Sequence, residues 1–281
     1  MPTPPVDRTI SALRSRVKLW RSGGIKIALV PTMGALHAGH LALVGEARKR
    51  AGRVLASIFV NPKQFAPADD FDTYPRDEAA DLAKLGESGV DAVFVPTAAE
   101  MYPEGFATSI TVGGPTRDLE TISRPQFFSG VATVVAKLLQ IATPDFAVFG
   151  EKDYQQLLVI RRMAADLAFP IEIVAGPTVR ENDGLALSSR NAYLTPPERE
   201  KAPRLYKALH DAATSIRGGM SGDTAIALAE GELTGFGFLV DYVALRNAVT
   251  LARVADQKKE PMRLLAAVWL GKTRLIDNVA V

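Results

Sequence analysis

The sequence contains no cysteine. Disulfide bonds, thiolate nucleophiles and zinc sites with cysteine ligands are therefore excluded. An excess of either charge is also missing, because 33 Lys and Arg against 31 Asp and Glu leave a net charge of +2. This balance lacks the excess of positive charge that binds a nucleic acid or a membrane surface, so we expect neither as a partner.

Long hydrophobic runs are absent too. No stretch approaches the ~20 apolar residues that a membrane-spanning helix needs. Residues 1–20 carry Arg and Lys throughout, unlike a signal peptide. Together with the missing cysteines, which fit a reducing compartment, these features predict a cytoplasmic protein. Hydrophobic residues make up 47% and charged residues 23% of the 281 residues, which is ordinary for a globular enzyme and excludes a disordered chain.

Short runs rich in β-branched residues alternate with longer amphipathic stretches in the first part of the chain. This alternation predicts an α/β fold, with a parallel sheet, right-handed crossovers and helices on both faces. Asp7 is expected to cap the first helix. The predicted strands are 25–30, 54–60, 92–95, 146–149 and 171–174, and the predicted helices are 10–20, 40–50, 77–85, 129–141 and 154–167.

The alternation of predicted strands and helices ends after Gly176 and Pro177. Two helices are predicted at 198–216 and 223–233, followed by two closing strands at 239–245 and 263–270. Helices followed by adjacent strands indicate a small α+β domain. We therefore predict an N-terminal domain over residues 1–178 and a C-terminal domain over residues 179–281.

The first polar cluster, PTMGALHAGH at residues 31–40, follows the first predicted strand and opens a helix. Gly34 and Gly39 allow close approach of the backbone, and a helix N-terminus offers N–H groups to a phosphate. His37 and His40 are two of the three histidines in the chain, and an imidazole can donate to a phosphoryl oxygen. We favour a phosphate-binding turn over a purely structural one. A zinc site on the two histidines has no indicated third ligand.

Three further clusters follow predicted strands or lie near the domain boundary. Residues 59–65 (FVNPKQF) include Gln64, whose amide can both donate and accept hydrogen bonds. Residues 149–156 (FGEKDYQQ) include Lys152, a point charge suited to phosphate, and residues 180–191 (RENDGLALSSRN) combine hydroxyl groups with the Arg190 guanidinium. Each alone could be a capped helix or a solvated loop. Ligands of doubly wound sheets bind at the carboxyl ends of the strands, which favours a shared site.

An acidic stretch follows the second cluster. We interpret most of it as a solvated loop and helix face, with one or two members as candidates for Mg²⁺, which takes one or two carboxylates together with phosphates and water. His210, in a predicted helix, is interpreted as structural. The acidic residues are Asp69, Asp70, Asp72, Asp77, Glu78 and Asp81.

Taken together, the clusters resemble the pantothenate synthetase family, the pantoate–β-alanine ligases. The matching stretches are VPTMGALHAGH, SIFVNPKQF with YPR, VFGEKDYQQL and DGLALSSRNAYL, in order from about Lys26 to Leu194. Weaker matches are the Arg-Pro at 124–125 with FSGVATVV after it, and TRLIDN at 273–278. Four motifs in the right order make the resemblance highly specific.

The resemblance implies a fold and an activity. The fold is a Rossmann-like nucleotidylyltransferase domain with a smaller α+β lid domain at the C-terminus. The activity joins pantoate and β-alanine to pantothenate with ATP and Mg²⁺, through a pantoyl adenylate, and releases AMP and pyrophosphate. The family is usually a cytoplasmic homodimer.

The resemblance also implies site residues. Catalytic roles fall on His40, His37, Lys152 and Arg190. Gln64 and Gln156 match pantoate-binding glutamines, with Gln64 also a candidate for β-alanine, and Asp81 matches a position linked to Mg²⁺. The implied ATP contacts are Pro31, Thr32, Met33, Gly34, Ala35, Leu36, His37, Ala38, Gly39, His40, Gly150, Glu151, Lys152, Asp153, Val179, Leu187, Ser188, Ser189 and Arg190.

Four residues depart from the family pattern. Ala38 and Ala80 stand where acids occur, Phe127 replaces a histidine, and Leu187 replaces a methionine of similar volume. The changes at Phe127 and Ala80 weaken any ligand or metal role near them.

Two alternatives to the ligase stay open. The chain could be a nucleotidylyltransferase acting on another acceptor, or a non-catalytic nucleotide-binding protein of the same fold. The two glutamines and the Ser-Ser-Arg-Asn sequence argue for the ligase over another transferase. The intact set of His, Lys and Arg residues argues against a binding protein.

Overall fold

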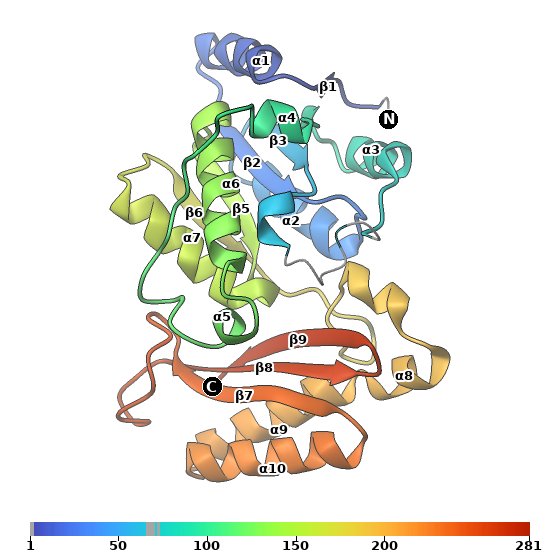
Figure 1. The fold of residues 1–281 in the computed structure, drawn as a ribbon, viewed down its shortest axis with the longest axis vertical. Helices are drawn as coiled ribbons and strands as arrows, with labels where there is room; N and C mark the ends of the chain where they lie inside the picture. The colour runs from blue at the N-terminus through green and yellow to red at the C-terminus, as the bar shows by residue number, and fades with distance from the viewer. Residues whose placement is uncertain (1–2, 66–70, 72–73) are drawn as a thin grey trace. The chain divides into compact units, whose positions relative to one another are not determined.

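A computed structural model describes residues 3–65, 71 and 74–281, and the chain divides into two compact units (Figure 1). Unit 1 comprises Met1–Glu151 and Gln156–Pro177, and unit 2 comprises Lys152–Gln155 and Thr178–Val281. The short segment Lys152–Gln155 therefore belongs with the C-terminal residues, although it lies far from them in sequence.

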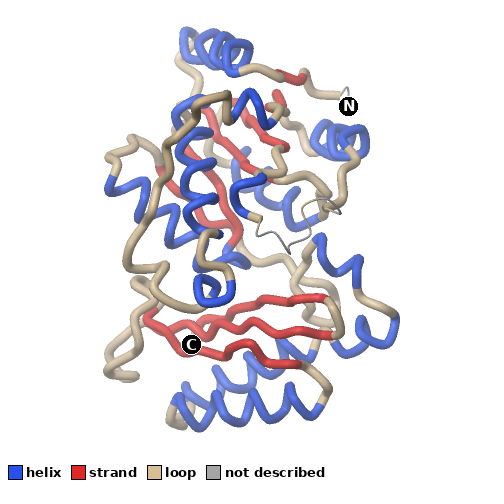
Figure 2. The backbone as a smooth tube through the Cα atoms, viewed as in Figure 1, coloured by secondary structure: helices blue, strands red, loops and turns tan. Residues whose placement is uncertain are grey.

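Unit 1 is built on a six-stranded sheet in the order β1-β4-β3-β2-β5-β6 (Figure 2). All of its strand pairs are parallel. The predicted α/β class with a parallel sheet is confirmed. The strands are β1 (Val6–Asp7), β2 (Ile27–Thr32), β3 (Arg53–Ile58), β4 (Ala92–Phe94), β5 (Phe146–Gly150) and β6 (Glu172–Gly176).

Helices cover this sheet. Ala28 and Val30 of β2 pack against Leu43 and Val44 of α2, while α6 lies along the sheet in Figure 1. None of the helices in the described part of the chain is long and apolar enough to cross a membrane. The helices are α1 (Ile10–Ser22), α2 (Ala38–Arg48), α3 (Glu78–Glu87), α4 (Ala98–Met101), α5 (Glu120–Ser123), α6 (Phe127–Ala142) and α7 (Tyr154–Asp166), with 3₁₀ turns η1 (Pro62–Gln64) and η2 (Glu151–Asp153).

The strand order creates a switch point at the centre of the sheet. The chain runs from β2 outward to β3 and β4, and from β5 outward to β6 in the opposite direction. Ligands of open α/β sheets bind beyond the carboxyl ends of the strands at such a point. The first polar cluster begins in the last two residues of β2 and continues into α2, and Gly150 ends β5.

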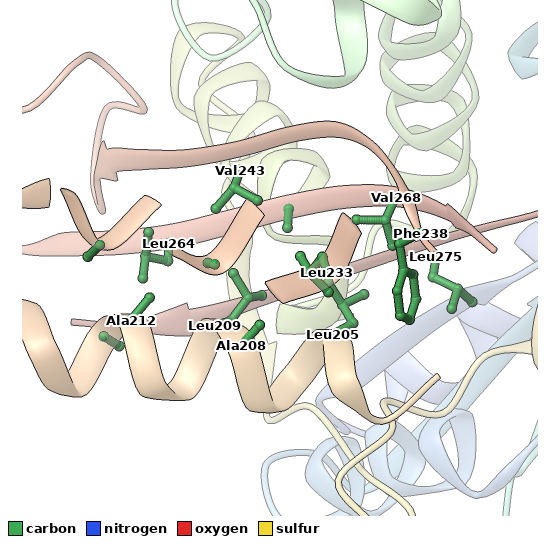
Figure 3. Close-up of a cluster of buried hydrophobic side chains, with 14 of the residues drawn as sticks. Leu205, Ala208, Leu209, Ala212, Leu233, Phe238, Val243, Leu264, Val268 and Leu275 are labelled. Carbon is green, nitrogen blue, oxygen red and sulfur yellow. The ribbon is translucent and has the colours of Figure 1, made fainter. Parts of the chain in front are cut away.

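Unit 2 contains an antiparallel sheet in the order β7-β8-β9. Apolar residues of α9 and α10, such as Leu205, Leu209 and Leu233, pack against Leu264 and Val268 of β8 (Figure 3). The elements are β7 (Leu239–Asn247), β8 (Met262–Leu270), β9 (Thr273–Ala280), α8 (Pro196–Lys201), α9 (Arg204–Arg217), α10 (Gly222–Gly235) and the 3₁₀ turn η3 (Ser189–Tyr193).

Two predictions for unit 2 are wrong. The single helix expected at 198–216 is two helices, because Pro203 lies between α8 and α9 and has no N–H to continue the first. Two closing strands were expected, whereas the structure has three. The additional strand is β9, whose polar Arg274, Asp277 and Asn278 obscure the apolar pattern.

The predicted cap of the first helix is also wrong. Thr9 caps α1, because its Oγ1 accepts the Ala12 N–H at 3.2 Å. Asp7 lies in β1 instead, where its carboxylate pairs with the Arg16 guanidinium at 2.5 Å and 2.9 Å.

Candidate active site

The turn after β2 has a strained backbone. Gly34 has a φ of 84° and Ala35 a φ of 50°, both in the left-handed region. A Cβ at Gly34 would lie 2.9 Å from Asp81 Oδ2, so a side chain does not fit there. At Ala35 this conformation costs about 1–3 kcal/mol and persists only when the surroundings hold it.

Helix α3 provides that support through a carboxylate and an ammonium group. Asp81 is 2% exposed; its Oδ2 accepts the Ala35 N–H at 2.9 Å and its Oδ1 accepts the Leu36 N–H at 2.8 Å. Lys84, one turn later, donates from Nζ to the Leu36 carbonyl at 2.7 Å. Residues three apart lie on the same helix face. Together they fix the backbone that leads to His37 and His40.

Asp81 does not fit the role of a Mg²⁺ ligand. Both of its oxygens accept backbone N–H groups, and the side chain is almost fully buried. Mg²⁺ requires near-octahedral oxygen ligation and usually keeps several waters. The neighbouring residue, Ala80, has no carboxylate to offer.

The other acidic candidates have different surroundings. Asp77 caps α3 by accepting the Ala80 N–H at 3.0 Å, and Glu78 pairs with Arg8 at 2.5 Å. Across residues 3–65, 71 and 74–281, no group of three or more His, Asp or Glu is arranged to hold a metal ion. The remaining candidates, Asp69, Asp70 and Asp72, lie outside the described residues.

We expect Asp81→Asn to destabilise unit 1 and raise the KM for ATP. The amide keeps one oxygen, but its NH₂ group faces a backbone N–H, and a buried unsatisfied donor costs about 1–3 kcal/mol. Urea unfolding and steady-state kinetics measure both effects. Asp77→Asn is the matched control on the same helix, because asparagine caps helices as well as aspartate does. Equal effects of the two substitutions would contradict the role given to Asp81.

The two histidines cap α2. His37 Nδ1 accepts the Gly39 N–H at 3.2 Å, and His40 Nδ1 accepts the His37 N–H at 3.4 Å. The ring centroids are 4.1 Å apart. A nitrogen that accepts carries no proton, so each neutral ring holds its proton at Nε2. Each ring then has Nε2–H as its donor, and both rings lie at a helix N-terminus whose dipole favours an anion.

A hydrogen-bond chain orients Gln64. Asn61, which is 1% exposed, donates from Nδ2 to Gln64 Oε1 at 3.0 Å and accepts from the Tyr102 hydroxyl at 2.7 Å. Gln64 Nε2 in turn lies 3.2 Å from Met33 Sδ. Burial raises the pKa of Tyr102, which keeps its hydroxyl protonated as a donor. The turns after β2 and β3 therefore meet at Gln64 and Met33.

Asn61 and Tyr102 are absent from the predicted site residues. The signal for Asn61 is an Asn-Pro pair directly after a buried strand, which is typical of a turn start. Tyr102 follows a short helix, α4, that the sequence pattern does not reveal.

Helix α6 approaches this region closely. A Cβ at Gly130 would lie 2.2 Å from the Lys63 carbonyl oxygen, so only glycine allows the approach. Phe127, which stands where the family has histidine, lies 4.0 Å from the Arg124 guanidinium, and Arg124 donates to the Gln64 carbonyl at 3.4 Å. Phe127 thus supports an arginine beside Gln64.

In unit 2, a β-bridge pairs Arg180 with Ala186, and the Leu187 N–H donates to the Val179 carbonyl at 3.0 Å. These contacts bring together Val179 and Leu187, both implied ATP contacts. Ser188 then caps η3 by accepting the Arg190 N–H at 3.2 Å, so the Ser-Ser-Arg sequence begins a 3₁₀ turn.

Arg180 is another residue that the predictions miss. Its guanidinium donates to both Asp277 oxygens, at 2.6 Å and 2.9 Å, and lies 3.8 Å from the Tyr206 ring. It therefore fastens the segment with Val179 and Leu187 to β9.

The predicted residues thus form groups within each unit. Unit 1 brings together His37 with His40, and Met33 with Gln64. Gln156 is half-buried in the first turn of α7. In unit 2, Lys152 Nζ lies 3.6 Å from Asp153 Oδ1, and the Lys152 side chain is 19% exposed.

Comparison with known proteins gives a consistent result. A family model described as Pantoate-beta-alanine ligase matches residues 6–280. The pantothenate synthetase of Rhodospirillum rubrum is 54% identical over 278 residues, covering 99% of each chain. That of Caulobacter vibrioides is 53% identical over 285 residues, covering 100% of each chain.

Solved structures are similar as well. The crystal structure of pantothenate synthetase from Thermus thermophilus has a TM-score of 0.92 and 48% sequence identity, covering 98% of each chain. The pantoate-beta-alanine ligase from Francisella tularensis, in complex with beta-gamma ATP and beta-alanine, has a TM-score of 0.82 and 34% identity. That match covers 99% of this chain and 97% of the other.

Proposed function

The chain belongs to the pantoate–β-alanine ligase family, and from this premise we propose how its residues perform the reaction. The activity is the ATP-dependent ligation of pantoate to β-alanine. In the proposed route a pantoate carboxylate oxygen attacks the α-phosphorus of ATP. The bond from that phosphorus to the bridging oxygen breaks, and pyrophosphate leaves. The β-alanine amine then attacks the pantoyl carbonyl, loses a proton and releases AMP.

The first step needs alignment and charge stabilisation more than proton transfer. Pantoate is already ionised at neutral pH, so its carboxylate attacks without a general base. Negative charge builds on the phosphoryl oxygens and on the leaving pyrophosphate. Donors that are already oriented toward such oxygens stabilise this charge without reorganisation. His37, His40, Lys152 and Arg190 are the proposed donors.

The paired capping of the histidines is the observation that carries this proposal. Both Nδ1 atoms accept backbone N–H groups at 3.2 Å and 3.4 Å, so both donors are directed through Nε2. The pair forms a reciprocal capping box, and each imidazole, unlike the hydroxyl or carboxylate usual in such a box, keeps a second ring nitrogen. Two imidazole rings whose centroids are 4.1 Å apart at the start of α2 match a group with several oxygens, such as a triphosphate.

The remaining roles follow the family resemblance. Met33 to His40 and Gly150 to Asp153 are proposed to contact ATP, with Lys152 toward the phosphates. Residues 187–190 contribute hydroxyl groups and a guanidinium. Gln64 and Gln156 are proposed to bind pantoate through the hydrogen-bonding capacity of their amides.

We also propose Mg²⁺, a homodimer and a cytoplasmic location, all of which the family resemblance supports. Mg²⁺ would neutralise part of the triphosphate charge. Since Asp81 does not fit as its ligand, phosphate and water oxygens would hold the ion, with Asp69, Asp70 and Asp72 as the remaining carboxylate candidates. Sedimentation analysis tests the dimer: a species of about twice the 30.2 kDa chain mass is expected, and a monomer would contradict it.

We expect Gln64→Ala to raise the KM for pantoate by about tenfold or more, because losing one hydrogen bond to a charged group costs about 1.5–3 kcal/mol. The KM for ATP should change little. Gln140→Ala, at an exposed position of the neighbouring helix α6, is the matched control and should leave both values near normal. An unchanged pantoate KM in a folded Gln64→Ala protein would remove Gln64 from the pantoate site.

An isotope experiment tests the proposed route. With ¹⁸O in the pantoate carboxylate, attack on the α-phosphorus transfers one labelled oxygen to AMP. Mass spectrometry of AMP after pantothenate formation should find one ¹⁸O per molecule. Unlabelled AMP formed with pantothenate would exclude the adenylate and point to another activated intermediate.

A further inference from the structure

The TRLIDN sequence on β9 has no role in the mechanism described so far. Asp277 and Asn278, near its end, are only 4% and 3% exposed, although both are polar. The Asp277 carboxylate forms an ion pair with the Arg180 guanidinium. Buried polar side chains are expensive unless they are hydrogen-bonded, so the partners of Asn278 indicate what it does.

Asn278 holds the backbone of the proposed catalytic lysine. Its Nδ2 donates to the Lys152 carbonyl at 2.9 Å, across 126 residues of sequence. Its Oδ1 accepts from Arg263 Nε at 2.6 Å. Since guanidinium nitrogens only donate, the Arg263 contact determines which end of the amide faces Lys152.

Tyr154, two residues after Lys152, is held through its side chain. The Arg263 guanidinium lies 3.9 Å from the centre of the Tyr154 ring, and the Tyr154 hydroxyl donates to the Ala248 carbonyl at 2.8 Å. All of these residues lie in unit 2, which explains why Lys152–Gln155 groups with the C-terminal residues.

We propose that Asn278, oriented by Arg263, is a positioning residue that fixes the backbone of Lys152 for the adenylation step. The lysine ammonium group is carried on a flexible four-carbon stem, so an anchored backbone limits the region that the ammonium group can occupy. A misplacement of about 1 Å can cost a factor of 10² in rate. The inference rests on the proposed role of Lys152 toward the phosphates.

A double-mutant cycle tests the proposal. Asn278→Ala is expected to lower the rate of adenylate formation by about 10- to 100-fold. In a Lys152→Ala background the same substitution should have almost no further effect, because it acts through a side chain that is already gone. The same fold-loss in both backgrounds would overturn the proposal, since it would show a general structural effect.

The outcomes separate this inference from the proposed function. If Lys152→Ala itself leaves adenylation unchanged, the catalytic role of Lys152 fails. If Lys152→Ala is slow but Asn278→Ala is near normal, only the positioning role fails.

Two further variants keep the test interpretable. Thr273→Val changes another buried polar residue of β9, at its opposite end, and should leave adenylation near normal. Asn278→Asp serves if Asn278→Ala does not fold, because a carboxylate keeps the acceptor for Arg263 and replaces the donor to Lys152 with an oxygen that repels the Lys152 carbonyl. Hydrogen exchange should then rise in the segment around Lys152 in the Asn278 variants and stay unchanged in Thr273→Val. Unchanged protection of the segment around Lys152 in both Asn278 variants would contradict the anchoring.

Discussion

Lys152→Ala is expected to lower kcat for pantothenate formation by about 10²–10⁴-fold while the fold is retained, as seen when a donor to developing charge is removed. In the proposed mechanism the lysine supplies a full positive charge that stabilises the triphosphate as it reacts. The first half-reaction should bear most of the loss, because the pyrophosphate charge develops there. Single-turnover kinetics of adenylate formation measures this directly.

Two controls sharpen this expectation. Lys152→Arg keeps the charge but changes its geometry, so it should recover only part of the rate. Lys49→Ala removes an exposed lysine that pairs with Glu46 on α2 and should leave the rate near normal. A folded Lys152→Ala protein with normal adenylation would remove Lys152 from the mechanism.

His40→Ala is expected to give a loss of similar size, about 10²–10⁴-fold in kcat, because it removes the donor that we propose for a phosphoryl oxygen. It also removes the acceptor for the His37 N–H. These two losses can be separated by His40→Asn, whose side-chain oxygen can still accept that N–H but has no counterpart of Nε2–H. His40→Asn should therefore be stable yet slow.

If His40→Asn restores nearly full activity, His40 serves only as part of the helix cap. Thermal unfolding of both variants checks the structural part, since loss of a cap interaction costs about 0.5–2 kcal/mol.

Much of the fold follows from sequence periodicity. The runs that became β2, β3 and β5 are apolar on both faces, which is how buried parallel strands appear in a sequence. The switch between β2 and β5 then follows from strand order. The sequence predictions are wrong where a single residue determines the bounds of a helix. Pro203 separates α8 from α9, and Thr9 caps α1 in place of Asp7.

The site was harder to predict because its support is long-range. Asp81 contacts residues 45 and 46 positions away, and Asn278 reaches Lys152 over 126 positions. No pattern within a short stretch of sequence indicates contacts between residues so far apart. The residues proposed to meet substrates came from short motifs, whereas Asn61, Tyr102, Arg180 and Arg263, which hold other residues in place, became visible only in three dimensions.

Pantoate-dependent exchange of labelled pyrophosphate into ATP tests the central claim most directly. The reaction contains Mg²⁺ and ATP but no β-alanine, so only a reversible first step can return label to ATP. We predict rapid exchange with pantoate and none without it. Absence of exchange in a folded protein that binds ATP would contradict the pantoyl adenylate route and the roles assigned to His40 and Lys152.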